Sequence, residues 1–296
     1  MSGSDRIALA CFVSSGVFAG GNAVAVRFTV REMEPLWGAG FRFLLAAAVL
    51  LVIVVIMKLE LPRGRALAGA ALFGTLNFAA AFALAYYGLT HVHAGLGSTL
   101  LALVPLATLV LAVAQRQERF RPAALVGALV ALIGVGLISG AALESAPAPA
   151  LLALLGSVVC FAEATVLVRR LPPIHPITMN AVGMSVAAVL LIGGAAFGGE
   201  ALTLPDRAAT WVALAYLIPV GSIAVFVLFL VMLRYWSASR AAYVDVIIPF
   251  VAVAFSWWLD DEPITGGLLA GGALILIGVY LGALRPSETV AEISSA

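Results

Sequence analysis

The sequence predicts an all-α integral membrane protein whose ten transmembrane helices form two five-helix repeats of inverted topology. Three observations support this prediction. Hydrophobic residues make up 63% of the 296 residues and charged residues only 10%, whereas a soluble domain carries about 25% charged residues. The chain also divides into apolar runs of membrane-spanning length, and its two halves repeat each other.

Ten apolar runs reach the length of about 20 residues that a helix needs to cross a bilayer. They are 7–26, 36–57, 66–87, 93–114, 122–141, 149–168, 176–197, 209–233, 240–259 and 264–284. Runs such as Leu44–Met57 do not alternate between polar and apolar residues, which excludes strands of a transmembrane barrel. The segment before the first run has no net positive charge, so we interpret this run as a span rather than a signal peptide.

The distribution of basic residues predicts the orientation, because Lys and Arg accumulate in cytoplasmic loops. Twelve basic residues fall on the side of the termini and three on the other, while Arg42 lies within a span. We therefore expect both termini, including the tail 285–296, in the cytoplasm of a bacterium, with the chain in its inner membrane.

The two halves, 7–141 and 149–284, align without a gap at one constant offset, which we call the main offset. It places Pro105 on Pro249, Glu118 on Glu262, Gly127 on Gly271 and Gly134 on Gly278. Near the N-terminal ends of the halves a slightly shorter offset places Arg27 on Arg169 and Pro35 on Pro176. An odd number of spans per half requires opposite insertion. Inverted repeats are a transporter architecture, with the substrate site near the middle of the membrane between the halves.

Several motifs carry a resemblance to a known family. They are Gly-Gly-Asn-Ala-Val-Ala-Val-Arg at 20–27, Pro35, Phe41-Arg42-Phe43, the series Ala94, Pro105, Glu118, Gly127 and Gly134, and its later repeat at Pro249, Glu262, Gly271 and Gly278. Over residues 7–284 the chain resembles the EamA-type transporters of the drug/metabolite transporter superfamily, most of all bacterial exporters of amino acids, including aromatic ones. The resemblance implies ten helices in inverted repeats of five, no use of ATP, and export of metabolites. Glu163 and Asp245 depart from the family pattern.

Ionisable residues within spans cost about 2.5–3.5 kcal/mol on insertion scales, so each indicates a role. Arg42 either reaches the nearby interface or faces the cavity as a carboxylate-binding or gating group. Glu163 and Asp245 are candidates for proton coupling. Alternatively, Glu163 pairs with Arg169 or Arg170, and Asp245 pairs with Arg240 or Arg234.

Uncharged polar residues supply further candidates for a substrate cavity. Asn22, Asn77 and Asn180 lie in three different spans, where an asparagine bridges helices or contacts substrate. The remaining candidates are Tyr86, Tyr87, Ser98 and Thr99, near the corner of the third and fourth spans, and Tyr243. For the tyrosines, the alternative is an aromatic belt at the membrane interface.

These features predict a secondary transporter that exports small neutral or zwitterionic metabolites by alternating access, with amino acids first, including aromatic ones. Only Arg42 places a basic group within a span, which disfavours polyanionic substrates. We expect a monomer in the lipid bilayer with a small-molecule substrate, no nucleic acid, no cofactor and no metal. The alternatives are an exporter of hydrophobic drugs or other metabolites, a passive channel or scramblase, and a membrane enzyme.

Overall fold

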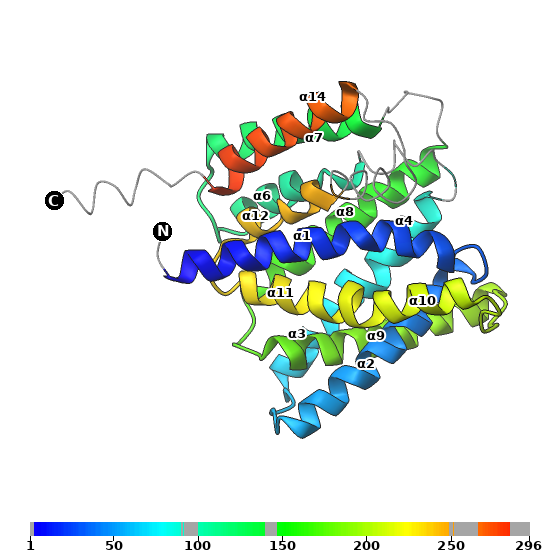
Figure 1. The fold of residues 1–296 in the computed structure, drawn as a ribbon. Helices are drawn as coiled ribbons and strands as arrows, with labels where there is room; N and C mark the ends of the chain where they lie inside the picture. The colour runs from blue at the N-terminus through cyan, green and yellow to red at the C-terminus, as the bar shows by residue number, and fades with distance from the viewer. Residues whose placement is uncertain are drawn as a thin grey trace.

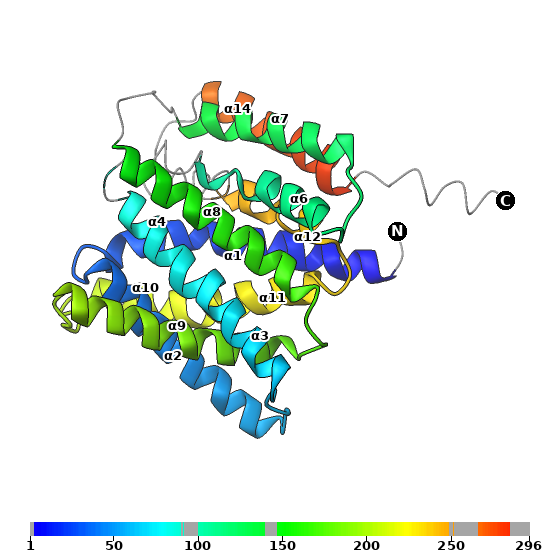
Figure 2. The same cartoon turned by 180° about the vertical axis from the view of Figure 1, so that it is seen from behind.

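The computed structural model describes residues 3–89, 91, 100–139, 147–248, 251 and 266–284. These residues form a bundle of helices without a strand (Figures 1 and 2). The first repeat contains α1 (Gly3–Thr29), α2 (Pro35–Ile56), α3 (Arg65–Gly74), the π-helix η1 (Thr75–Ala80), α4 (Ala81–Leu89), α6 (Val104–Ala114) and α7 (Pro122–Ser139). The second contains α8 (Ala148–Val168), α9 (Pro176–Gly198), α10 (Ala208–Tyr216), the π-helix η2 (Leu217–Ala224), α11 (Val225–Met232), α12 (Ala238–Ala241), α14 (Gly266–Val279) and the π-helix η3 (Tyr280–Leu284).

The helices coincide with the predicted spans. Five helical runs within the described residues are long and apolar enough to cross a membrane: Pro35–Ile56, Arg65–Leu89, Ala148–Val168, Pro176–Gly198 and Ala208–Met232. Shorter apolar helices occupy Val104–Ala114, Pro122–Leu137 and Leu269–Leu284. The chain is therefore an all-α, multi-pass membrane protein. The starts of the fourth and tenth predicted spans, the end of the fifth and part of the ninth lie outside the described residues.

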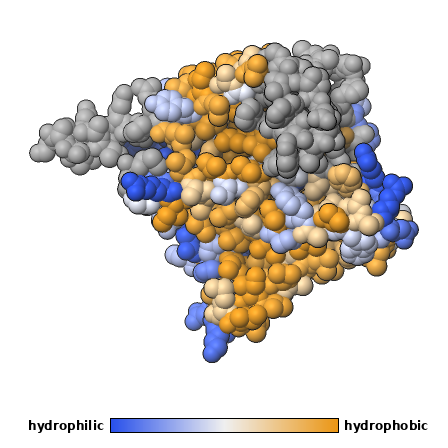
Figure 3. Space-filling model, viewed as in Figure 1, coloured by the Kyte–Doolittle hydropathy of each residue, from blue (hydrophilic) through white to orange (hydrophobic). Residues whose placement is uncertain are grey.

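The surface of the bundle matches a lipid environment. Large apolar side chains point outward along the helices, for example Val55 at 75% exposure and Phe197 at 96%. Figure 3, viewed as Figure 1, shows a broad apolar surface across the middle of the bundle, with polar residues gathered toward the ends of the helices. The interior, by contrast, is rich in alanine and glycine, which let helix backbones approach closely where apolar side chains gain nothing by leaving lipid.

Equivalent helices of the two halves pack against each other. Helix α2 packs along α9, and α7 packs along α14; the latter pair lies side by side in both views (Figures 1 and 2). Contacts between non-equivalent helices also occur in corresponding pairs, in which the first span of each repeat contacts the third span of the other. Helix α1 of the first repeat contacts α10 and α11, the third span of the second, while η1 and α4, from the third span of the first repeat, contact α8, the first span of the second.

The α7–α14 contact shows the exchange residue by residue. A Cβ atom built on Gly127 would lie 2.6 Å from the carbonyl oxygen of Gly278, and one on Gly134 would lie 2.6 Å from that of Gly271. In the main offset, Gly127 corresponds to Gly271 and Gly134 to Gly278. Each glycine therefore faces the counterpart of the other, which is the contact pattern of a two-fold interface between antiparallel helices.

Two local features also recur in both halves. Lys58, after α2, has φ of 51°, and Gly199, after α9, has φ of 76°. The next amide, Leu59 N or Glu200 N, donates a 2.9 Å hydrogen bond to the carbonyl of Val54 or Ala195, which closes the helix end in the same way. The π-helices η1 and η2 likewise begin at corresponding positions of the shorter offset. Pro219 accounts for η2, because proline cannot donate within a regular helix and clashes with the preceding turn.

Candidate functional site

A small cleft opens beneath the loop between α1 and α2 and reaches Arg42. Its volume is ≈ 280 Å³, including the open space at its mouth. Its lining comes from the end of α1, the start of α2, α4, α10 and η2: Val26, Thr29, Val30, Met33, Glu34, Pro35, Gly38, Ala39, Arg42, Tyr86, Leu214 and Leu217. We call it the first cleft.

A larger cleft opens beneath the loop between α8 and α9, with a volume of ≈ 670 Å³ that includes the open space at its mouth. Its lining is Val168, Arg169, Leu171, Pro172, Pro173, Ile174, Pro176, Met179, Leu230, Leu233 and Arg234. We call it the second cleft. The α1–α2 and α8–α9 connections lie at opposite ends of the bundle (Figure 1).

The two clefts occupy corresponding places in the two repeats. The shorter offset converts Val26 to Val168 and Pro35 to Pro176, and these four residues line the clefts. Each cleft is bounded by the corner between the first two helices of a repeat and by the third span of that repeat, through Tyr86 in the first cleft and Leu230 in the second. The first cleft is lined in addition by Leu214 and Leu217 of the second repeat. The fold therefore places a cleft at the corresponding corner at each end of the bundle.

The Arg42 side chain is buried, with 4% of the residue exposed. Its Nε donates to Ser222 Oγ at 2.7 Å, and its Nη2 donates to the carbonyl of Gly221 at 3.5 Å. The guanidinium lies over the rings of Phe43 and Phe82, 5.1 and 5.6 Å from their centroids. No carboxylate pairs with it in the part of the chain that the structure describes, so the charge is held by dipoles and aromatic faces alone.

Asn22 joins Arg42 at the same turn of η2. The Asn22 Nδ2 donates to the Gly221 carbonyl at 3.0 Å, while the buried Oδ1 accepts no hydrogen bond from the described residues. A Cβ atom at position 221 would lie 1.9 Å from Asn22 Oδ1, so only glycine permits this approach. We call Asn22, Arg42, Gly221 and Ser222 the polar hub; it connects α1 and α2 of the first repeat to η2 of the second.

Aromatic rings cover the inner side of the polar hub. Phe43 contacts Phe78 and Phe82, and Phe78 packs edge-on against Phe226 of the second repeat with 4.7 Å between centroids. Phe82 also contacts Tyr86 and Phe161. These six residues, Phe43, Phe78, Phe82, Tyr86, Phe161 and Phe226, form the aromatic cluster. Of them, Tyr86 lines the first cleft.

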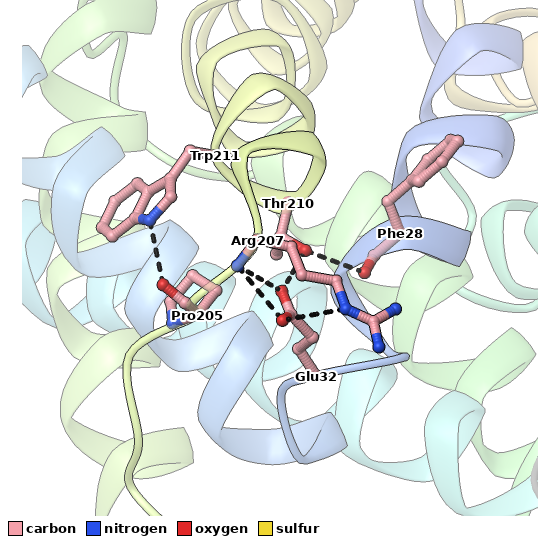
Figure 4. A network of polar contacts seen from close by, with 6 residues as sticks. All are labelled: Phe28, Glu32, Pro205, Arg207, Thr210 and Trp211. Atoms are coloured by element: carbon pink, nitrogen blue, oxygen red, sulfur yellow. Dashed lines mark hydrogen bonds and ion pairs between the residues drawn. The ribbon is translucent and has the colours of Figure 1, made fainter.

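Two carboxylates join the two repeats beside the first cleft. Glu32, in the α1–α2 loop, accepts hydrogen bonds from the backbone amide of Arg207 at 3.2 Å and from the Thr210 hydroxyl, and its Oε1 lies 3.5 Å from Arg207 Nε (Figure 4). Glu200, after α9, accepts from the amides of Leu36 and Trp37 at 3.2 and 2.8 Å and thereby caps α2. We call these contacts the Glu32 and Glu200 clasps.

Within the described residues, the corresponding corner at the second cleft has no such clasps. In the shorter offset, Glu32 corresponds to Pro173 or Ile174, and Glu200 corresponds to Leu59. Helix α9 is capped instead by its own His175, whose Nδ1 accepts from the amide of Ile177 at 3.3 Å. A different contact joins the repeats at that end: Glu118 accepts from the amide of Ser239 at 3.0 Å and from its hydroxyl.

The structure distributes the remaining candidate residues over several environments. Tyr243 is 1% exposed, donates to the carbonyl of Ala124 and packs against Gly282. It lines neither cleft, so we assign it to helix packing. Tyr87 is 49% exposed and stacks on His91, 4.7 Å between centroids, on the outside of the bundle. Ser98 and Thr99 lie outside the described residues.

Asn77 and Asn180 are both buried in contacting elements, η1 and α9. Asn77 Nδ2 and both polar atoms of the Asn180 side chain have no hydrogen-bond partner among the described residues. Gly74 and Gly183 pack together nearby, because a Cβ at either position would lie within 3.2 Å of the other glycine's Cα. These asparagines therefore belong to the interface between the repeats and line neither cleft.

The two candidate coupling acids differ in their partners. Glu163 Oε2 accepts a 2.5 Å hydrogen bond from Gln115 Nε2. The arginines predicted as its alternative partners bind backbone carbonyls instead, Arg169 that of Leu233 and Arg170 that of Gln115. Asp245 forms no side-chain hydrogen bond or ion pair with any residue that the structure describes. Its predicted partners are engaged elsewhere, Arg240 with the carbonyl of Ala283 and Arg234 with that of Ile174.

Two parts of this region were not among the candidates from sequence. Ser222 is fully buried and binds Arg42. The neighbouring Pro219 and Gly221 interrupt an otherwise apolar span, and irregular backbone at membrane depth occurs where it is buried in protein or lines a cavity. Glu32 carried no signal in sequence, because an acid in a short loop is ordinarily solvated.

A helical membrane protein of two similar halves, with an equivalent cleft at each end, has the architecture of a membrane carrier. A family model described as the EamA-like transporter family matches residues 6–140 and again 148–283. The chain therefore belongs to the EamA-like transporter family and is a transporter, not an enzyme.

Relatives and solved structures agree with this assignment. The uncharacterized inner membrane transporter YedA of Escherichia coli K12 is 28% identical over 280 residues, which are 90% of each chain. A Salmonella typhimurium protein named probable amino-acid metabolite efflux pump is 27% identical over 278 residues, 88% of this chain and 89% of that one. A crystal structure at 20% identity superposes with a TM-score of 0.77 over 94% of this chain and 96% of the other, which shows the shared fold.

Proposed function

We propose that this transporter exports small neutral and zwitterionic metabolites, amino acids first and aromatic ones among them, by alternating access. The observation that carries the proposal is the pair of equivalent clefts at opposite ends of the bundle. Two repeats that exchange their packing contacts can exchange these entrances by a rocking motion around a fixed central site. The antiparallel packing of equivalent helices supports an inverted repeat.

The substrate class rests on the chemistry next to the first cleft. One buried arginine and several neutral polar groups favour a compact substrate with few charges, and the aromatic cluster offers an apolar surface. The similarity to a named amino-acid metabolite efflux pump supports the same class.

Counterflow in proteoliposomes tests this function directly. Vesicles loaded with unlabelled amino acid should take up the labelled amino acid transiently, at two internal pH values, and empty vesicles should not. No counterflow for any member of a panel of amino acids would contradict the proposal. The panel should include phenylalanine, leucine and alanine, because these differ in apolar bulk but share the zwitterion.

We further propose that the protein lies in a bacterial inner membrane with the first cleft facing the periplasm and both termini in the cytoplasm, on the basis of the Lys and Arg distribution. In a background with Cys11 and Cys160 replaced by alanine, a cysteine at the exposed Thr203 should react with an impermeant maleimide in intact cells. One at the exposed Arg63 should react only after lysis. The reverse pattern would invert the orientation.

A further inference from the structure

Among the residues that the structure describes, Arg42 has no carboxylate partner, although a buried cation ordinarily has one. Arginine offers five N–H donors, and the described residues provide acceptors for two of them, at Ser222 and Gly221. The guanidinium also lines the first cleft. A buried charge without an opposite charge is costly, so an anionic group that arrives from the cleft would complete this site.

The same hub contains an acceptor without a donor. Asn22 Nδ2 and Arg42 Nη2 both bind the Gly221 carbonyl, so Asn22 and Arg42 meet at one residue. The Asn22 Oδ1 is buried and accepts no hydrogen bond from the described residues. A ligand that supplies both an anionic acceptor and a cationic donor would satisfy both groups at once.

We infer that the polar hub binds the zwitterionic head of an α-amino acid, with the carboxylate on the Arg42 guanidinium and the ammonium on Asn22 Oδ1. Phe82 and Tyr86, whose rings lie 6.2 Å apart beside Arg42, offer a surface for the apolar side chain of the substrate. This inference rests on the proposed function and specifies which atoms recognise the substrate.

The sequence positions that correspond to Arg42 and Ser222 in the other repeat carry no similar polar side chains. The counterpart of Arg42 is Gly183 or Met184, and that of Ser222 is Ala80. The second cleft therefore has no equivalent guanidinium at this depth, although it carries Arg169 and Arg234 near its rim, both bound to backbone carbonyls. The structure thus assigns head-group recognition to the α1–α2–η2 junction.

The test compares three probes that share a phenyl ring: phenylalanine, phenethylamine without the carboxylate, and 3-phenylpropionate without the ammonium. In counterflow, Arg42→Gln should reduce phenylalanine exchange at least tenfold, whereas phenethylamine exchange should stay within about twofold of wild type. Asn22→Ala should reduce phenylalanine exchange more than that of 3-phenylpropionate. Arg63→Gln, which removes a cation from an exposed loop, is the matched control and should change none of the three.

Thermal stability of the wild type provides a readout that does not depend on variant folding. Phenylalanine and 3-phenylpropionate should raise Tm in detergent, because ligands that bind the folded state stabilise it, and phenethylamine should raise it less. If the wild type exchanges amino acids and Arg42→Gln exchanges them equally well, or loses all three probes alike, the hub is not a carboxylate site although the proposed function stands. If no amino acid is exchanged yet carboxylates raise Tm, the anion site stands and the proposed substrate class fails. If neither occurs, both are wrong.

Discussion

Replacement of Gly127 by alanine tests the close packing of α7 against α14. The new Cβ would lie 2.6 Å from the carbonyl oxygen of Gly278 and 2.7 Å from the amide nitrogen of Gly282. These are backbone atoms and cannot rotate away. Ordinary contact begins at 3.4 Å, so the helices must separate by about 0.8 Å at this point.

Overpacking of a tight core costs about 1–3 kcal/mol, and a chain of roughly this size loses about 2–4 °C of Tm per kcal/mol. We therefore expect Gly127→Ala to lower Tm in detergent by several degrees. Gly193→Ala in α9 is the control, because its Cβ would meet nothing within 4 Å. Thermal unfolding followed by size-exclusion chromatography of the remaining soluble protein measures both variants side by side.

The contact between Gly127 and Gly278 also predicts that substitutions at these two positions are energetically coupled. Gly278→Ala would place its Cβ 2.6 Å from the carbonyl oxygen of Gly127, so both substitutions force the same pair of helices apart. Once one alanine has separated the helices, the second alanine costs less. The double variant should therefore lose less free energy of unfolding than the sum of the two single losses, by at least about 0.5 kcal/mol. A Tm of Gly127→Ala equal to that of Gly193→Ala, or strict additivity in the double variant, would refute this account of the interface.

Three further predictions concern single ionisable groups. Asp245→Asn should abolish pH-driven accumulation but retain counterflow, while Glu163→Gln should retain both. Of these two acids, Glu163 binds Gln115, whereas Asp245 has no side-chain partner among the described residues. Flux assays with and without a pH gradient would contradict this prediction if the two variants behaved alike. Glu32→Gln should weaken the clasp on the first cleft, so a cysteine at Thr29, buried at 6%, should be alkylated severalfold faster than with Glu32 intact. Burial, together with the charge of Arg234, lowers the pKa of His175, so its neutral form is favoured in the folded state. The stability that neutral His175 contributes is present above pH 6.5 and is lost as the pH falls through the lowered pKa. The fall in Tm between pH 7.5 and 5 should be smaller in His175→Asn than in the wild type. An equal fall would exclude a contribution of His175 to the pH dependence of stability.

Much of the fold follows from sequence because lipid imposes strong constraints. Apolar runs predict helices whose ends nearly coincide with those of α2, α8 and α9, and the glycines repeated at the main offset proved to be the contact points of α7 and α14. Arg42 was identified because a charge within a span is rare.

The rest depended on contacts that no local pattern encodes. Tyr243 resembled a cavity residue, yet its hydroxyl is satisfied by a carbonyl of a helix 119 positions earlier in the chain. Ser222 lies in the π-helix η2 of the second repeat and accepts a hydrogen bond from Arg42 of the first, a contact between distant segments. Glu163 is close in sequence to Arg169 and Arg170, but it accepts a hydrogen bond from Gln115 instead. The two arginines donate to backbone carbonyls of other segments.

The two clasps at the first cleft have an energetic consequence for a carrier with two access states. Identical halves would give both states the same free energy. Glu118 has an acidic counterpart in sequence, Glu262, but Glu32 and Glu200 have none. If each of these two carboxylates contributes about 1 kcal/mol net, they favour the state closed at the first cleft roughly thirtyfold. In the proposed alternating-access cycle, these two residues outside the polar hub would then set the resting population, and substitutions there would shift this population without altering specificity.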